Sequence, residues 1–78
     1  MEEKLYLIIN ELLISNNKID KPLQINESLK LRDDLGMDSF NLAELTVHIE
    51  EEFGIDIFEF GIVNTVGEIL VKLKSCNE

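Results

Sequence analysis

Apolar side chains recur at helical spacing in three stretches of the chain. In residues 2–15 they fall at i, i+3, i+4, i+7 and i+8, which forms one stripe of an amphipathic helix. These positions are Leu5, Ile8, Ile9, Leu12 and Leu13. The second run comprises Leu42, Leu45, Ile49 and Phe53, and the third comprises Val66, Ile69, Leu70 and Leu73. The pattern therefore predicts three main helices.

Capping residues mark the ends of the second and third helices. Asp38 and Ser39 offer side-chain oxygens for an N-cap directly before the second run, and Gly54 follows that run as a C-cap. Thr65 is placed to cap the third helix, whose last turns hold two lysines that suit the negative end of the helix dipole.

Two segments lack this periodicity. After residues 15–17 the chain enters a loop of about 20 residues, whose spaced leucines and isoleucines can pack against the helices. Residues 55–63 are apolar but interrupted by Gly61, so we expect only a short helical turn there. The predicted fold is all-α. It is a small antiparallel four-helix bundle, with three main helices, one short helix and a long first loop, in a single domain over residues 1–78.

Length and charge restrict what such a bundle can do. The chain has 78 residues, 45% of them hydrophobic, so it holds one small core and disfavours a catalytic cleft between lobes. Its formal charge is −9, from 16 acidic and 7 basic residues. This charge disfavours nucleic acid and anionic membranes, and it favours a partner that presents Lys and Arg.

The same residues bear on the compartment. The lone cysteine, Cys76, excludes an internal disulfide and is typical of a reducing compartment. The first residues are acidic, and the longest apolar run, residues 5–9, is far shorter than the roughly 20 residues of a membrane span. We therefore expect a cytoplasmic monomer with no membrane insertion.

The negative charge is concentrated in the middle of the chain. Residues 33–71 contain ten Asp and Glu and no Lys or Arg, whereas the flanks are almost neutral. An acidic surface aids solubility wherever it lies. Its segregation favours a surface that docks basic partners, because unrelieved self-repulsion costs stability.

Ser39 is the residue best placed for chemistry. A serine in the first turn of a helix lies at the positive end of the dipole, where free N–H groups favour a phosphate ester. The structural alternative is an ordinary cap. A hydrolytic role is disfavoured because the only histidine, His48, lies about 180° around the same helix and roughly 13 Å along it. We expect His48 to be exposed or half-packed and assign no catalytic residue.

The acidic segments and Phe40 give weaker indications of function. The acids and glycine of residues 33–38 do not fit a calcium-binding loop, so no specific metal site is expected, although residues 50–52 suit adventitious divalent binding. Phe40 lies about 200° off the core stripe of its helix, so it is either a contact residue for a partner or partly packed against the loop.

The residues around Ser39 resemble the acyl carrier protein signature. The resemblance rests on Leu35-Gly36-Met37-Asp38-Ser39-Phe40, then Glu44-Leu45, then Ile49-Glu50-Glu51-Glu52-Phe53-Gly54-Ile55-Asp56-Ile57. The order of helix, long loop, helix, short helix and helix extends it across nearly the whole chain. It implies that Ser39, flanked by Asp38, receives 4′-phosphopantetheine from coenzyme A through a phosphopantetheinyl transferase.

The resemblance also implies partners and a carrier role without catalysis. The arm would hold acyl groups as thioesters for acyl ligases, synthases or acyltransferases with basic patches. The family positions that dock such enzymes correspond to Asp38, Phe40, Glu44, Val47, Glu50 and Glu51.

Two departures from the fatty-acid carriers favour a specialised member. Phe40 stands where most of them have leucine, and Asn41 stands where they are usually acidic, so we expect both to alter the docking face. Phe40 is reminiscent of D-alanyl carrier proteins, which serve cell-wall teichoic acid modification, but the chain has no tryptophan, which those carriers have. Two alternatives therefore remain: a D-alanyl carrier, and an acidic helical adaptor without a prosthetic group.

Overall fold

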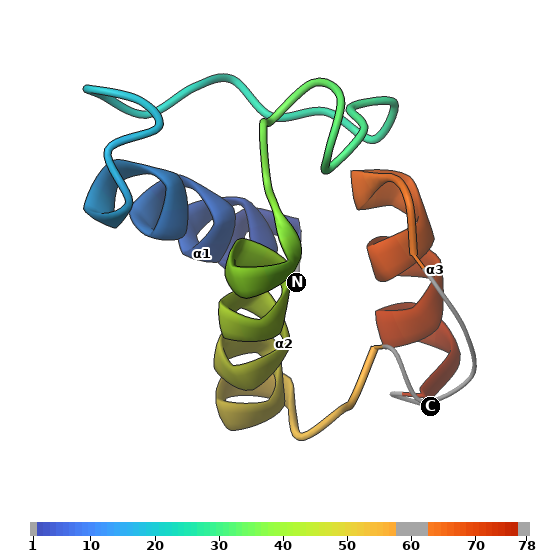
Figure 1. The fold of residues 1–78 in the computed structure, drawn as a ribbon. Helices are drawn as coiled ribbons and strands as arrows, with labels where there is room; N and C mark the ends of the chain where they lie inside the picture. Colours follow the sequence, from blue (N-terminus) through green and yellow to red (C-terminus); the bar gives the residue numbers. More distant parts are fainter. Residues whose placement is uncertain (1, 58–62, 77–78) are drawn as a thin grey trace.

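Three helices make up the regular structure of the chain. The structure is a computed structural model that describes residues 2–57 and 63–76. Within these ranges it contains α1 (Glu2–Ser15), α2 (Ser39–Phe53) and α3 (Val66–Cys76), and no strand beyond one isolated bridge between Lys30 and Thr65 (Figure 1). The all-α prediction and the three main helices are confirmed. The predicted short helical turn falls largely on residues 58–62, outside the described residues, and the described residues beside it are not helical.

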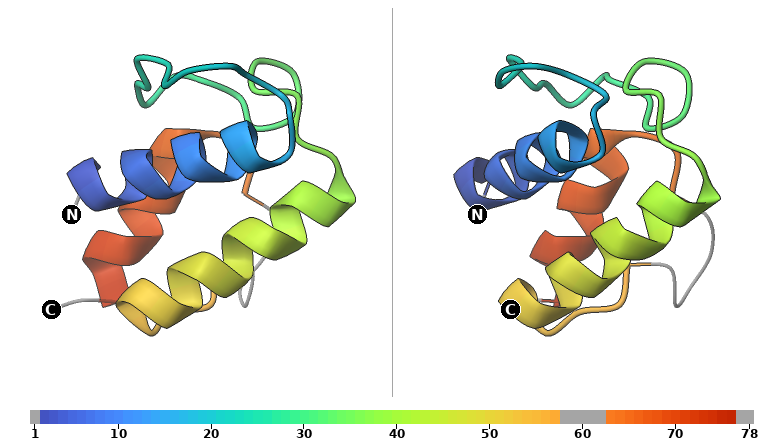
Figure 2. Two further views of the ribbon diagram at one scale, coloured as in Figure 1. Left: turned by 90° about the vertical axis from the view of Figure 1, so that its left-hand side faces the viewer. Right: turned by 60° about the vertical axis from the view of Figure 1, so that its left-hand side comes forward.

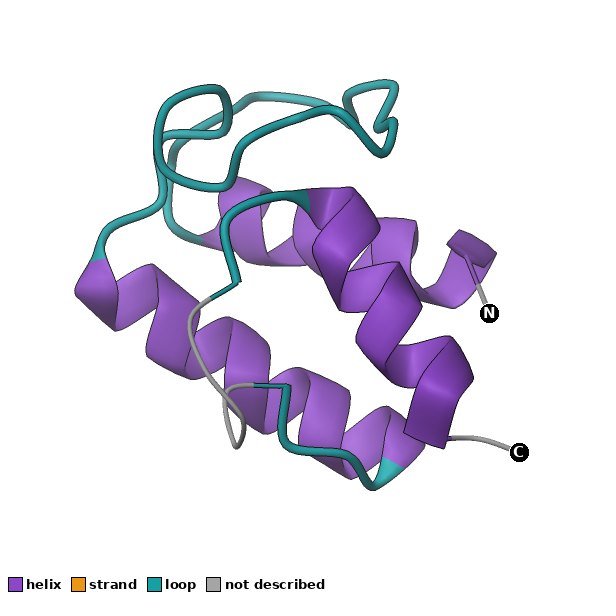
Figure 3. Cartoon of the chain, turned by 90° about the vertical axis from the view of Figure 1, so that its right-hand side faces the viewer, coloured by secondary structure: helices purple, strands orange, loops and turns teal. Residues whose placement is uncertain are grey.

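The three apolar stripes meet in one core. α1 and α2 run in opposite directions, and α3 crosses from α1 to the C-terminal end of α2 (Figures 2 and 3). The buried stripe residues of the helices are Leu5, Ile9, Leu12, Leu13, Leu42, Leu45, Ile49, Val66, Ile69, Leu70 and Leu73. Two predicted stripe residues, Ile8 and Phe53, are only half-buried at the edge of this core.

The long loop contributes to the core as well. Ile25, Leu31 and Leu35 are buried, as expected, and Met37 joins them. The expectation was wrong for Leu23, whose side chain is 42% exposed. The reason is that the loop is held here by its backbone. The Asn10 amide accepts from Leu23 N–H at 2.8 Å and donates to Leu23 C=O at 3.1 Å.

The middle of the loop is fixed to the start of α3. Val66 N–H donates to Leu29 C=O at 3.0 Å, and Gly67 N–H donates to Glu27 C=O at 2.9 Å. A Cβ at Gly67 would lie 3.0 Å from that Glu27 oxygen, a tight contact that would make the loop backbone shift, so glycine favours the close approach. The loop thereby satisfies N–H groups that the first turn of a helix leaves free. Because α1 and α3 both hold the loop, the chain enters α2 from a fixed position.

None of the described helices has both the length and the apolar content that a bilayer-spanning segment needs.

Candidate functional site

The segment before α2 is anchored by alternate residues. Leu35 and Met37 are both buried, and Met37 N–H donates to Leu31 C=O at 3.0 Å. Gly36 between them has φ of 71°, a left-handed conformation that other residues adopt at a cost. The Leu-Gly-Met sequence is therefore a tight turn between two core contacts, and it delivers the chain to Asp38.

Asp38 and Asn41 form a capping box at the start of α2. Asn41 N–H donates to Asp38 Oδ1 at 2.9 Å, and Asp38 N–H donates to Asn41 Oδ1 at 3.2 Å. This arrangement satisfies two backbone groups reciprocally. Asn41 is only 3% exposed, so the expectation that it alters the docking face was wrong: its amide is committed to the cap.

Ser39 is left free by this cap. It is the first residue of α2 and is exposed, and within residues 2–57 and 63–76 its hydroxyl makes no hydrogen bond. The backbone N–H groups of Ser39 and Phe40 are likewise without partners in this part of the chain. Asp38, and not Ser39, therefore performs the capping. An exposed hydroxyl beside free N–H groups at the positive end of a helix is suited to carry a phosphate ester.

The other predicted site residues lie along α2, and all of them except Glu44 are exposed. Phe40 is 67% exposed, which favours the contact interpretation over packing against the loop. Val47 is more than half exposed, and Glu50 and Glu51 are exposed. Glu44 is half-buried, because its carboxylate accepts a hydrogen bond from Asn16 Nδ2 at 3.1 Å. Neither Asn16 nor Asn10 was identified from the sequence, although an asparagine among apolar stripe positions is a sign of a polar anchor.

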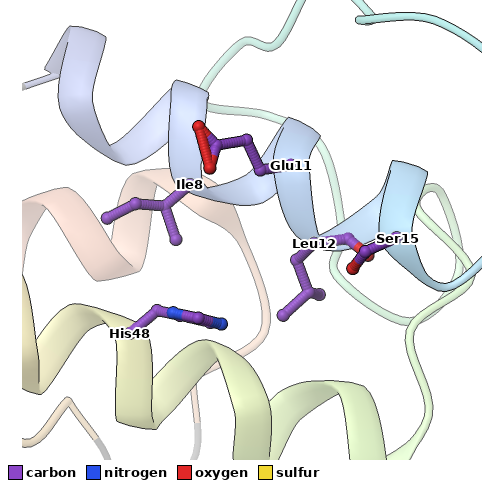
Figure 4. A pocket seen from close by; sticks show the side chains of 5 residues that line it. All are labelled: Ile8, Glu11, Leu12, Ser15 and His48. Carbon is purple, nitrogen blue, oxygen red and sulfur yellow. The ribbon is translucent and has the colours of Figure 1, made fainter.

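His48 lies on the flank of α2 that faces α1, close to Glu51 of this row. It is exposed and faces α1, where it lines a crevice with Ile8 and Leu12 (Figure 4). Ser39 is not among the residues of that crevice. Among the described residues no group of three or more His, Cys, Asp or Glu is arranged to hold a metal ion.

Comparison with known proteins identifies the class to which this site belongs. Residues 9–59 match the family model described as "Phosphopantetheine attachment site". The chain is also 34% identical over 76 residues to a protein named "Acyl carrier protein" from Lactobacillus acidophilus, and the match covers 95% of this chain and 94% of that one.

The chain belongs to the acyl carrier protein family. Its cofactor is 4′-phosphopantetheine, on which it carries acyl groups. Acyl carrier proteins are carriers and not catalysts, and they interact with phosphopantetheinyl transferases and acyl-handling enzymes. The exposed hydroxyl and free N–H groups at the start of α2 fit a phosphate-linked group.

Proposed function

We propose that Ser39 is the attachment residue and that the chain is a specialised acyl carrier of fatty-acid or related acyl or polyketide biosynthesis. In the loading step the Ser39 hydroxyl oxygen bonds to the phosphorus of the phosphopantetheinyl group. The bond between this phosphorus and the other phosphate of coenzyme A breaks, so 3′,5′-ADP leaves. The serine proton passes to a base of the transferase. When attached, the group supplies the thiol that carries acyl cargo as a thioester.

The observation that carries the proposal is the division of roles between Asp38 and Ser39. Asp38 caps α2, so the Ser39 hydroxyl has no structural task and is open to the transferase. The free N–H groups of Ser39 and Phe40 favour the negative phosphodiester. The Asp38 carboxylate is occupied by the cap and His48 lies in the crevice toward α1, so the proposal includes no catalytic activity of the chain itself.

The proposal includes a docking face on α2. Its residues are Asp38, Phe40, Glu44, Val47, Glu50 and Glu51. Exposed apolar side chains between carboxylates suit a partner patch that combines Lys or Arg with apolar contacts. The absence of any Lys or Arg in residues 33–71 supports the same surface. The partners are acyl ligases, synthases or acyltransferases.

Phe40 supports a specialised cargo over the generic fatty-acid role, because it projects beside the attachment point where partner enzymes would contact it. D-alanine remains the second candidate cargo on the same residue. The alternative of an adaptor without a prosthetic group is disfavoured, because the family's cofactor is phosphopantetheine. The acidic sequence with one cysteine supports a cytoplasmic monomer.

The test is loading in vitro. The protein is incubated with coenzyme A and a promiscuous phosphopantetheinyl transferase, and its intact mass is measured. We expect one added phosphopantetheinyl group in the wild type and in Ser75→Ala, a control that removes another exposed helix serine, and none in Ser39→Ala. Loading of Ser39→Ala would show that another residue is modified. The cargo is then read from the mass of the thioester on protein isolated from its native cell.

A further inference from the structure

We propose that the groove between α1 and α2 is a second docking surface, which receives a partner-protein segment that presents an apolar side chain between Lys or Arg residues. This inference rests on the proposed carrier function and extends it to a part of the molecule outside the α2 docking face. No docking residue predicted from the sequence lies on α1.

Two polar contacts between the helices limit the groove at its ends. Lys4 Nζ lies 2.6 Å from Glu52 Oε1, and Asn16 Nδ2 donates to Glu44 Oε1 at 3.1 Å. The first joins the start of α1 to the end of α2, and the second joins the opposite ends of the two helices, as expected for antiparallel neighbours (Figure 2). Between these contacts the helices are held by apolar packing.

The floor of the groove is apolar. His48 on α2 faces the side chains of Ile8 and Leu12 on α1, with the space between them open at the surface (Figure 4). Ile8 was predicted as a core residue but is half-buried, because it lies in this floor. Leu7 stands at the rim and is 58% exposed. Leu7 and Ile8 therefore add apolar surface that an incoming apolar side chain can contact.

The rim of the groove is acidic. Glu11 on α1 and Glu51 on α2 line it, and neither makes an ion pair within the described residues. Glu52 also lines it but is paired with Lys4, the one basic residue of the lining. An incoming segment therefore meets two unpaired carboxylates on opposite walls, which suits a positive charge on each side of an apolar residue.

The groove is continuous with the α2 docking face. Glu51 belongs to both, since it lies in the row of exposed acids on α2 and also lines the groove. A partner seated on α2 reaches the groove by extending past Glu51 toward α1. The resulting contact would bury surface of two helices. Its buried area would be closer to that of a specific protein–protein interface than the area of one helix face alone.

The test uses a synthetic helical peptide in which two arginines flank a leucine, titrated into ¹⁵N-labelled apo protein. We expect amide shifts around Leu7, Ile8, Glu11 and His48. We expect Leu7→Gln and Glu11→Gln each to weaken peptide binding about fivefold, because each removes one contact from the groove. The matched controls are Val71→Gln, which replaces an exposed valine on α3, and Glu3→Gln. Both should bind like the wild type, and all four variants should keep their melting temperatures, since the side chains are exposed.

Other outcomes would overturn the inference. Shifts confined to Phe40, Val47 and Glu50 would place the peptide on α2 alone. Equal binding of a peptide with glutamates in place of the arginines would remove the charge argument. Groove shifts that depend on protein concentration without peptide would identify a second copy of the chain as the occupant. Failure of Ser39 loading is a separate result: it would refute the carrier function and leave the peptide data on the apo protein as measured.

Discussion

Asp38 and Asn41 exchange two hydrogen bonds, of 2.9 and 3.2 Å, across the first turn of α2, and Ser39 between them takes part in neither. Asp38 therefore caps the helix, and the next residue, Ser39, keeps an exposed hydroxyl for the modification that we propose. Mutation of Asp38 should therefore lower stability, whereas mutation of Ser39 should prevent loading and leave stability nearly unchanged.

The first prediction concerns this separation. Asp38→Ala should lower the free energy of unfolding by about 1 kcal/mol, because it removes the N-cap acceptor. Ser39→Ala should change it by less than about 0.5 kcal/mol, because its hydroxyl holds nothing. Urea titrations monitored by circular dichroism measure both, with Asp38→Asn as a variant that keeps a capping oxygen. An equal loss in Ser39→Ala and Asp38→Ala would mean that the serine also caps the helix.

The second prediction concerns the turn before the site. Gly36→Ala should cost about 1 kcal/mol, because alanine is strained at φ of 71° although nothing lies near its Cβ. Gly36→Asn should cost less, since asparagine tolerates this conformation. Unfolding in urea gives the order. If alanine and asparagine proved equally neutral, the left-handed turn would be absent in solution.

The third prediction concerns the attachment of the loop to α1. Asn10→Ala should destabilise by about 1–3 kcal/mol, because it removes both partners of the Leu23 backbone. It should also speed hydrogen exchange at the Leu23 amide. Leu23→Ala is the matched control: its partly exposed side chain should cost less than about 1 kcal/mol. A larger loss in Leu23→Ala than in Asn10→Ala would mean that side-chain packing, and not the amide, holds this part of the loop.

The fourth prediction concerns the acidic middle of the chain. Residues 33–71 hold ten acids and no Lys or Arg, and the Lys4–Glu52 ion pair relieves one of these acids. Self-repulsion should therefore lower stability at low salt, and the melting temperature should rise with NaCl and with millimolar Mg²⁺ or Ca²⁺. Differential scanning calorimetry measures the rise. A melting temperature that responds to neither salt nor divalent ions would contradict this account.

The fifth prediction concerns the docking face. Glu50→Lys and Val47→Asp should raise the KM of a carrier-specific acyl ligase for the loaded protein by about tenfold, with kcat less affected, because each lies on the surface and away from Ser39. Glu3→Lys on α1 is the charge-matched control for Glu50→Lys and should leave both constants unchanged. A loss in kcat alone would instead indicate misplacement of the arm.

The helices could be predicted from the sequence because their apolar stripes and caps are local. Even so, Ile8 fits the stripe of α1 and is only half-buried, since periodicity defines a face without showing where the neighbouring helix leaves a gap. The predicted exposure of Asn41 and the predicted burial of Leu23 were wrong for a related reason. In both cases a hydrogen bond involving an asparagine side chain decides the burial, and hydrophobicity does not report such a bond.

Ser39 could be proposed as the attachment residue from the sequence because capping chemistry and the carrier motif converge on it. The sequence could not show which of the two residues caps the helix, since Asp38 and Ser39 are both good capping residues. The partner of Glu44 lies 28 residues earlier in the sequence, and only the packing of α1 on α2 brings them together.

The anchored loop has a consequence for how cargo is delivered. Asn10 holds the loop at Leu23, and the first turn of α3 holds it at residues 27–29. An arm attached at Ser39, as we propose, therefore has a fixed origin. The volume that the thiol can search is then set by the arm's own length. The effective concentration of cargo at an enzyme's active site then depends on where docking places the attachment point relative to that active site. Fluctuations of the protein chain would contribute little.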